Sequence, residues 1–145
     1  MATVWTIGYE RLLPEQLAAE LVAVGVERVI DVRFRPQSRR PGMSKTRLGA
    51  MLAGHGIAYE HRKALGTPPD LRHDFHAGRV EQARAGFEAH VEATAAGELD
   101  ALADELGHGP RTVLLCLEAD PAVCHRRVLT ERLGTRRPGL AVVDL

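Results

Sequence analysis

Short apolar runs alternate with segments of helical periodicity along the whole chain. Runs typical of strands cover residues 3–8, 27–33, 57–61, 111–118 and 140–145. Between them, apolar side chains recur at helical spacing over residues 13–25, 44–56, 79–96, 98–106 and 120–134. This alternation predicts an α/β fold, with a mainly parallel sheet of about five strands and helices on both faces. We expect a single three-layer domain over residues 1–145.

Residues with known positional preferences set the expected ends of these helices. Pro14 stands near the start of the first helix and Gly25 at its end. Ser44 is suited to cap the second helix. In the last helix Asp120 is the expected N-cap, Pro121 the first helical residue and Gly134 the end. The segment 63–70 is expected to be a loop, since it contains Gly and two prolines.

Composition favours a soluble protein of the cell interior. The chain has 145 residues, of which 45% are hydrophobic and 26% charged, as in ordinary globular domains. No apolar run approaches the roughly 20 residues that cross a bilayer, and the first ten residues lack the features of a secretory signal. Two cysteines are too few for a disulfide framework. We therefore expect a cytoplasmic protein with reduced thiols and no membrane partner.

Charge is distributed unevenly although the formal net charge is zero. Residues 32–63 carry eight cationic side chains and one carboxylate, Glu60, whereas the rest of the chain is acidic. A zero net charge argues against a generally cationic nucleic-acid binder. The local excess of positive charge instead suggests an anion site, and the alternative is a solvated surface loop.

Reactive residue types follow the predicted strands. Because open α/β sheets bind ligands at the carboxyl ends of their strands, we expect these residues to meet at one edge. Those after the first three strands are Tyr9, Arg33, Arg35, Gln37, Ser38, His61, Arg62 and Lys63. Those at and after the fourth are Cys116, Glu118, Asp120, Cys124, His125 and Arg126. The pattern therefore predicts one polar site at this edge.

Asp31 and Arg33 permit two interpretations. Asp31 stands within an apolar strand, where a carboxylate is costly unless it is paired or hydrogen-bonded. It could accept hydrogen bonds from loop amides and from Arg33. Either Asp31 holds the loop while Arg33 faces an anion, or the two residues form a structural ion pair that joins loop to strand.

The stretch LLCLEADPAVCHRR, residues 114–127, contains both cysteines and admits several chemistries. Either thiol could pack in the core as a small apolar group, and Cys124 near a helix start could instead be a nucleophile. His125 and Arg126 at a helix start suit a phosphate, or else face solvent. Metal binding is not favoured, because the paired C-x-x-C and H-x-x-x-H spacings of structural zinc sites are absent. We therefore predict no metal and no cofactor.

Two thiol-enzyme patterns were compared with this stretch. The tyrosine-phosphatase pattern requires Arg six positions after the Cys, where this chain has Ala122 and Thr130. A strand followed by Cys, a loop and a helix is also similar to rhodanese sulfurtransferases, in which loop amides surround the catalytic Cys. Here Glu118, Asp120 and Pro121 occupy that loop. A third possibility needs no nucleophilic thiol: Glu118, His125 and the arginines form a polar pocket for a nucleotide or nucleic-acid fragment.

The chain resembles a family called domain of unknown function 488 over most of its length. The resemblance rests on TIGYE, VIDVRFRPQSRRPGMSK, GIAYEHRKALG and, most specifically, LLCLEADPAVCHRRVL. The shared positions are Gly8, Asp31, Arg33, Pro36, Ser38, Tyr59, Leu65, Gly66, Cys116, Glu118, Cys124, His125 and Arg126. Many members have Gly where this chain has Thr67, and a small polar residue at Tyr9 or Glu10. The resemblance implies an α/β fold and a shared pocket, and it does not imply a reaction.

The sequence thus favours an enzyme-like pocket for a phosphorylated small molecule or a nucleic-acid-type ligand. The expected anion-binding residues are Arg33, Ser38, Arg39, Arg62, Arg126 and Tyr9. Glu118 and His125 are the candidates for proton transfer, and Cys124 or Cys116 is the candidate nucleophile. The alternatives are a non-catalytic nucleic-acid-binding module that uses residues 33–47 and a rhodanese-like thiol enzyme.

Overall fold

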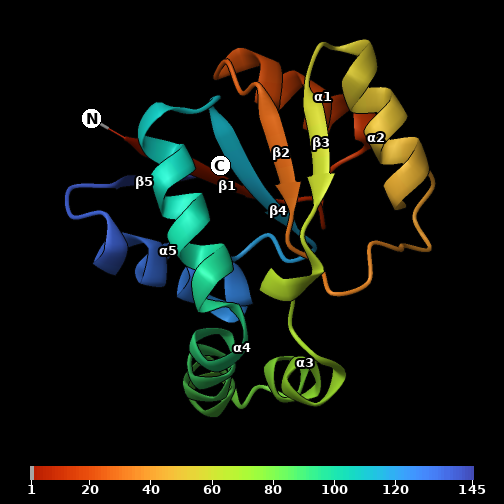
Figure 1. Ribbon diagram of the computed structural model, residues 1–145. Coiled ribbons are helices and arrows are strands. Elements are labelled where there is room, and N and C mark those ends of the chain that lie inside the picture. The colour runs from red at the N-terminus through yellow and green to blue at the C-terminus, as the bar shows by residue number, and fades with distance from the viewer. Residues whose placement is uncertain (1) are drawn as a thin grey trace.

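A computed structural model describes residues 2–145 and contains one sheet of five parallel strands (Figure 1). The strands are β1 (Thr3–Gly8), β2 (Arg28–Asp31), β3 (Ala58–His61), β4 (Thr112–Cys116) and β5 (Ala141–Asp144). The helices are α1 (Pro14–Ala23), α2 (Lys45–Gly54), α3 (Pro69–His76), α4 (Val80–His108) and α5 (His125–Arg136). The strand order is β3-β2-β4-β1-β5, so β4 separates β1 from β2. The predicted α/β class and the parallel sheet of five strands are confirmed.

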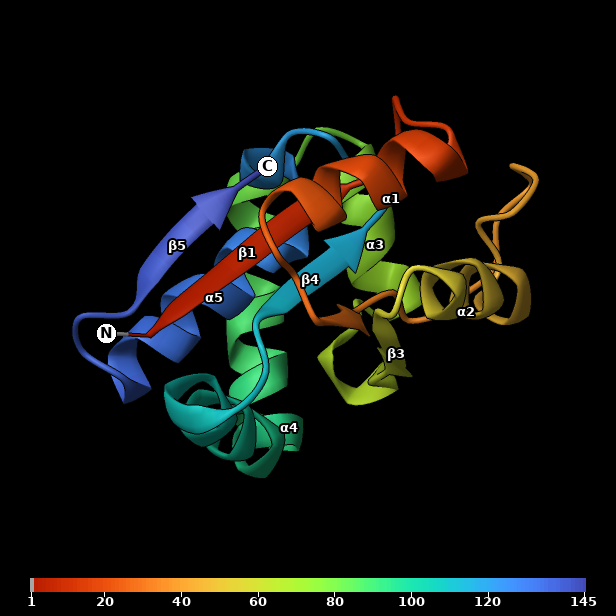
Figure 2. The same cartoon turned by 90° about the horizontal axis from the view of Figure 1, so that it is seen from above.

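Helices cover both faces of the sheet (Figure 2). The side chains of the strands alternate between the two faces. Val113 and Leu115 of β4 belong to the core that contains the buried side chains of α1 and α2. Leu114 and Cys116 belong to the opposite core, with α3, α4 and α5. All five residues of β4 are buried, as the apolar run predicted for a central strand.

Three helices differ from the expectations. Residues 69–76 form α3, although the loop was expected to extend to residue 70 and no element was predicted directly after it. Pro69 suits the first turn, and Phe75 is buried in the core beside α4. The two helices expected at 79–96 and 98–106 are one helix, α4, with a kink at Ala95. The last helix begins at His125, after a 3₁₀ turn over Pro121–Val123 that Asp120 caps, and it continues past Gly134 to Arg136.

The carboxyl ends of β1, β2 and β4 lie side by side, with Gly8 opposite Cys116 and Asp31 opposite Leu115. From β1 the chain crosses to β2 on one side, and from β4 it crosses to β5 on the other. Such a reversal of strand order is where open α/β sheets leave a crevice for ligands. Among residues 2–145, no helix combines the length and the apolar character needed to span a membrane.

Candidate functional site

A small pocket lies at these carboxyl ends, with room of about 40 Å³ for the centres of water-sized molecules and about 470 Å³ of empty space when its open mouth is counted. Tyr9 follows β1, and the chain from Arg33 to Gln37 follows β2. Thr67 comes from the loop before α3, Arg72 and Phe75 come from α3, and the remaining lining comes from residues 116–118 and 123–125. The structure therefore brings together Tyr9, Arg33, Cys116, Glu118, Cys124 and His125, as the strand-end argument predicted.

The two cysteines meet in the wall of this pocket, although they are eight residues apart. Their Sγ atoms are 2.6 Å from each other, and both side chains are buried. Cys116 ends β4, and Cys124 is the N-cap of α5 because its extended backbone separates the 3₁₀ turn from the helix. The delayed start of α5 turns Cys124 back toward Cys116. Both thiols thus contribute to the pocket as well as to the core.

His125 is held in one orientation by the backbone of the neighbouring strand end. Its Nε2 lies 2.8 Å from the carbonyl oxygen of Val32, which only accepts hydrogen bonds. Nε2 therefore carries the proton in the neutral ring, and Nδ1 is left as an acceptor 3.6 Å from Cys124 Sγ. Burial lowers the pKa of His125, which favours this neutral form. The imidazole is placed to accept a proton at Nδ1.

Glu118 is the anionic group of the site. Burial alone would raise its pKa, but hydrogen bonds from its own amide and from the Cys124 thiol, together with the two nearby histidines, lower it overall. One of these is His76 of α3, whose Nε2 lies 3.3 Å from the carboxylate. Burial, followed by the neighbouring Cys116, raises the pKa of Cys124 well above its ordinary value. At neutral pH the pocket therefore holds a carboxylate beside a protonated Cys124.

Arg126 lies behind the thiols and does not face the pocket. Its side chain is fully buried, and Nη1 donates to Cys116 Sγ at 2.8 Å. The guanidinium also donates to the carbonyls of Glu118 and Ala119 and to the hydroxyl of Thr6. The expected ligand-binding role therefore does not fit its position, because packing around the turn after β4 consumes its donors. Solvation at the surface is likewise ruled out for this residue.

The structure distinguishes between the two interpretations of Asp31 and Arg33. The Asp31 carboxylate accepts from Arg33 Nε at 2.9 Å and from Nη2 at 2.7 Å, in a bidentate pair. Arg33 Nη1 donates to Tyr9 Oη and to the Met43 carbonyl, and Tyr59 Oη donates to Asp31. Arg33 and Tyr9 line the pocket, but the charge of Arg33 is already neutralised by Asp31. The pair joins loop to strand, as the structural interpretation proposed.

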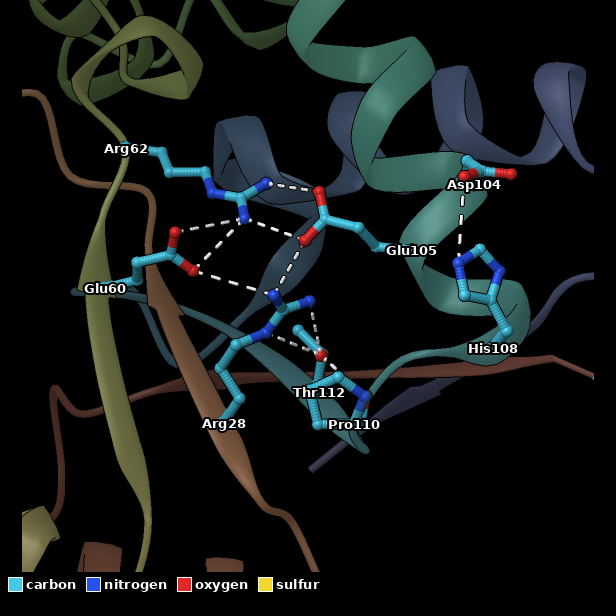
Figure 3. Close-up of polar contacts among 8 residues, drawn as sticks. All are labelled: Arg28, Glu60, Arg62, Asp104, Glu105, His108, Pro110 and Thr112. Carbon is cyan, nitrogen blue, oxygen red and sulfur yellow. Dashed lines mark hydrogen bonds and ion pairs between the residues drawn. The ribbon is translucent and has the colours of Figure 1, made fainter.

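Arg62 points away from the pocket into a separate ion-pair network, shown in Figure 3. Its guanidinium contacts Glu60 at 3.1 Å and Glu105 of α4 at 3.0 Å. Glu105 also binds Arg28, which donates to Thr112 at the start of β4. The network spans β2, β3, β4 and the end of α4, so Arg62 fastens this helix to the sheet and contributes no charge to the pocket.

Ser38 and Arg39 line a second surface hollow, beside the pocket. The hydroxyl of Ser38 accepts from the amide of Arg40, and its own amide donates to Ser44 Oγ. These hydrogen bonds stay within the segment 36–47 and do not involve the thiols. The hollow is formed entirely by residues of the segment 36–47, none of them acidic, and it adjoins the pocket at Gln37.

Three further residues line the mouth of the pocket: Arg35, which the strand-end argument included without an anion-binding role, and Arg72 and Thr67, which the expected site lacked. They also line an adjoining hollow over α3. Arg72 was missed because no element was predicted over residues 71–78, although Pro69, Asp70 and the positive φ of Gly78 mark the ends of a helix. Thr67 is placed by Gly66, where a Cβ would lie 2.4 Å from the Phe34 Cα.

The site residues lie largely within a region that a known family describes. The model of the family named "Domain of unknown function DUF488" matches residues 14–133. No curated protein and no solved structure matches the chain. The match covers all of the thiol, carboxylate and imidazole groups of the pocket, and leaves out β1 and β5 at the two ends. The chain therefore belongs to the DUF488 family.

Proposed function

We propose that the protein is an enzyme-like domain whose pocket binds a phosphorylated or nucleic-acid-type ligand. The observation that carries this proposal is the set of unsatisfied polar groups at the mouth. Arg35 and Arg72 are exposed there, and neither guanidinium has an ion pair or hydrogen bond within residues 2–145. Between them, the Thr67 side chain is buried and its Oγ1 has no hydrogen-bond partner in that part of the chain.

A buried hydroxyl without a partner costs about 1–3 kcal/mol, and a bound ion or water is one way in which such a group is satisfied. Two arginines beside it select an anion, and guanidinium groups match the oxygens of phosphate especially well. A phosphate at the mouth would place the rest of the ligand toward Glu118 and His125. Both side chains have a shifted pKa, which is common for groups that react with a bound substrate.

Binding of simple anions to the reduced protein tests the proposal. Inorganic phosphate and a nucleoside monophosphate are titrated by calorimetry, and the stabilisation is followed by thermal unfolding. Arg72→Gln and Arg35→Gln should each weaken binding by about tenfold, the loss of one charge-assisted hydrogen bond of roughly 1.5 kcal/mol. Arg111→Gln is the matched control, because Arg111 is an exposed arginine before the opposite end of β4. The proposal fails if neither anion binds, or if the three variants behave alike.

The basic hollow favours a nucleic acid as the second candidate ligand. Arg39, Lys45 and Arg47 are exposed around it, and it is continuous with the pocket at Gln37. A strand lying in the hollow could therefore present one unit to the pocket. Filter binding of a short single-stranded oligonucleotide at two salt concentrations tests this, since phosphate contacts make affinity fall steeply with salt. Absence of binding at low salt would leave only the small-molecule ligand.

A rhodanese-like reaction has less support from the loop after Cys116. In that reaction class, free loop amides surround the sulfur. Here the Ala119 amide donates to the Glu10 carboxylate, and the Ala122 amide donates to Asp120. The loop turns two of its carbonyls, not its amides, toward the buried guanidinium of Arg126.

A further inference from the structure

The thiols and the carboxylate in the wall of the pocket form a set of donors suited to a metal. The Sγ atoms of Cys116 and Cys124 and one carboxylate oxygen of Glu118 all lie within 4.8 Å of one another. The sequence spacing did not suggest such a site, because the turn after β4 and the delayed start of α5 create the proximity. We propose that these three side chains bind a divalent transition-metal ion of the zinc class.

The chemistry of the donors selects this class of ion. Thiolate ligands favour zinc and similar soft or borderline metals, whereas magnesium and calcium prefer sites made of oxygen. Three protein ligands leave a fourth tetrahedral position, which faces the pocket that the same residues line. This arrangement is typical of catalytic rather than structural zinc, because a water or a substrate oxygen completes the coordination.

The surroundings supply the partners that metal ligands require. The hydrogen bond from Arg126 Nη1 fixes Cys116 Sγ from behind, and His125 Nδ1 stands 3.6 Å from Cys124 Sγ on its other side. Two thiolates and one carboxylate around a divalent ion carry one net negative charge. That charge would balance Arg126, which is fully buried and has no carboxylate within ion-pair distance in residues 2–145.

A dithiol that cycles through a disulfide is the competing explanation. The sulfurs, 2.6 Å apart, would approach to about 2.05 Å in a disulfide and separate to roughly 3.7 Å around a tetrahedral zinc. Glu118 decides in favour of the metal. A carboxylate beside the thiols opposes formation of the thiolate that disulfide exchange needs, whereas all three groups are used by a metal.

This inference deepens the proposed function and rests on it for the role of the metal. The ion would polarise an oxygen of the ligand that the arginines hold, and Glu118 would serve as a ligand to the metal while His125 remains the group that accepts a proton. Metal binding and phosphate binding are measured separately, the latter on metal-free protein. Loss of one without the other therefore identifies which proposal fails.

Cobalt(II) is the probe. It is added under nitrogen to reduced, chelator-treated protein, and we expect one equivalent to give a thiolate-to-cobalt charge-transfer band and the visible bands of a tetrahedral centre, both removed by zinc. Cys116→Ser and Cys124→Ser should abolish the charge-transfer band, and Glu118→Gln should weaken binding at least tenfold. Asp104→Asn is the control, since Asp104 and His108 form an exposed pair on the far part of α4 (Figure 3).

A measurement on the wild-type protein covers the case in which the serine variants do not fold. Because both thiols are buried, their labelling by iodoacetamide is followed in moderate urea, where zinc should slow it and a chelator should restore its rate. The inference is overturned if reduced protein gives no charge-transfer band, or if zinc leaves the labelling unchanged. It is also overturned if the protein loses two hydrogen atoms in mass to a disulfide that forms equally with and without zinc.

Discussion

The guanidinium of Arg126 donates a hydrogen bond to the sulfur of Cys116 at 2.8 Å, across the turn that connects β4 to α5. The same side chain donates to the carbonyls of Glu118 and Ala119 and to Thr6, whose hydroxyl in turn donates to Asp144. One buried cation thus joins β1, β4, β5 and α5. Its place in the family pattern is explained by this support of the pocket wall rather than by contact with a ligand.

Arg126→Met should therefore destabilise the protein by about 3 kcal/mol or more, because two buried carbonyls and a hydroxyl lose their donor. Urea unfolding of the reduced protein measures the change in the free energy of unfolding. Arg127→Met is the matched control. The side chain of Arg127, the next residue in α5, is 37% exposed and makes one contact of 3.5 Å to Asp144. A surface contact of this kind is worth less than about 1 kcal/mol. Equal losses in the two variants would contradict the supporting role of Arg126.

Gly8 is a second position at which the pocket wall tolerates no change. A Cβ there would lie 1.7 Å from the carbonyl oxygen of Glu118 and 2.8 Å from Arg126 Nη1. Gly8→Ala must push the turn that carries Glu118 away from β1, so we expect a loss of at least about 3 kcal/mol and weaker binding of phosphate and cobalt.

Gly134→Ala provides the opposite case. Gly134 lies within α5, and its Cβ would meet no atom within 4 Å. The substitution should stabilise the protein by roughly 0.5–1 kcal/mol, the helix-propensity difference between the two residues. Thermal unfolding distinguishes the two outcomes, and a destabilised Gly134→Ala or a neutral Gly8→Ala would refute the packing described.

Local patterns were sufficient to predict most of the fold. Apolar runs with turn residues located all five strands, and helical spacing located α1, α2 and α5, because each such element buries one face or both. The predicted ends of the helices were wrong where local and tertiary preferences compete. Ala95 bends α4 without ending it, since Phe87 and Leu99 on either side of the bend pack in the same core.

The site was harder to predict, because a strand-end rule gives positions and not side-chain directions. It correctly gathered Cys116, Glu118, Cys124 and His125. It also included Arg62 and Arg126. Arg62 forms ion pairs with Glu60 and Glu105 outside the pocket, and Arg126 donates its hydrogen bonds within the core. Charge in a sequence does not reveal which arginines are already paired. Within residues 2–145, Arg35 and Arg72 line the mouth without an ion pair.

The contact between α4 and α5 gives the protein a defined sensitivity to acid. Glu92 accepts from Arg136 Nη2 and from Arg132 Nε, each at 2.8 Å. These bonds, with that to Arg136 the larger contribution, lower the pKa of Glu92 from 4.5 to about 2. A folded-state pKa below the unfolded one adds stability above pH 4.5, and this stability is lost as the pH falls toward 2.

Glu92→Gln should therefore lower the free energy of unfolding by roughly 1 kcal/mol at neutral pH, a value reduced because the carboxylate is 31% exposed and screened by solvent. The difference from wild type should shrink below pH 4.5 and fall to about half near pH 3, as protonation removes the same charge in the wild-type protein. Urea unfolding of both proteins between pH 7 and pH 3 measures it. Glu81→Gln serves as the control, because Glu81 is an exposed carboxylate of α4 with no ion pair to α5 within residues 2–145. A difference between Glu92→Gln and wild type that stays constant across this range would show that the ion pairs with α5 do not stabilise the fold.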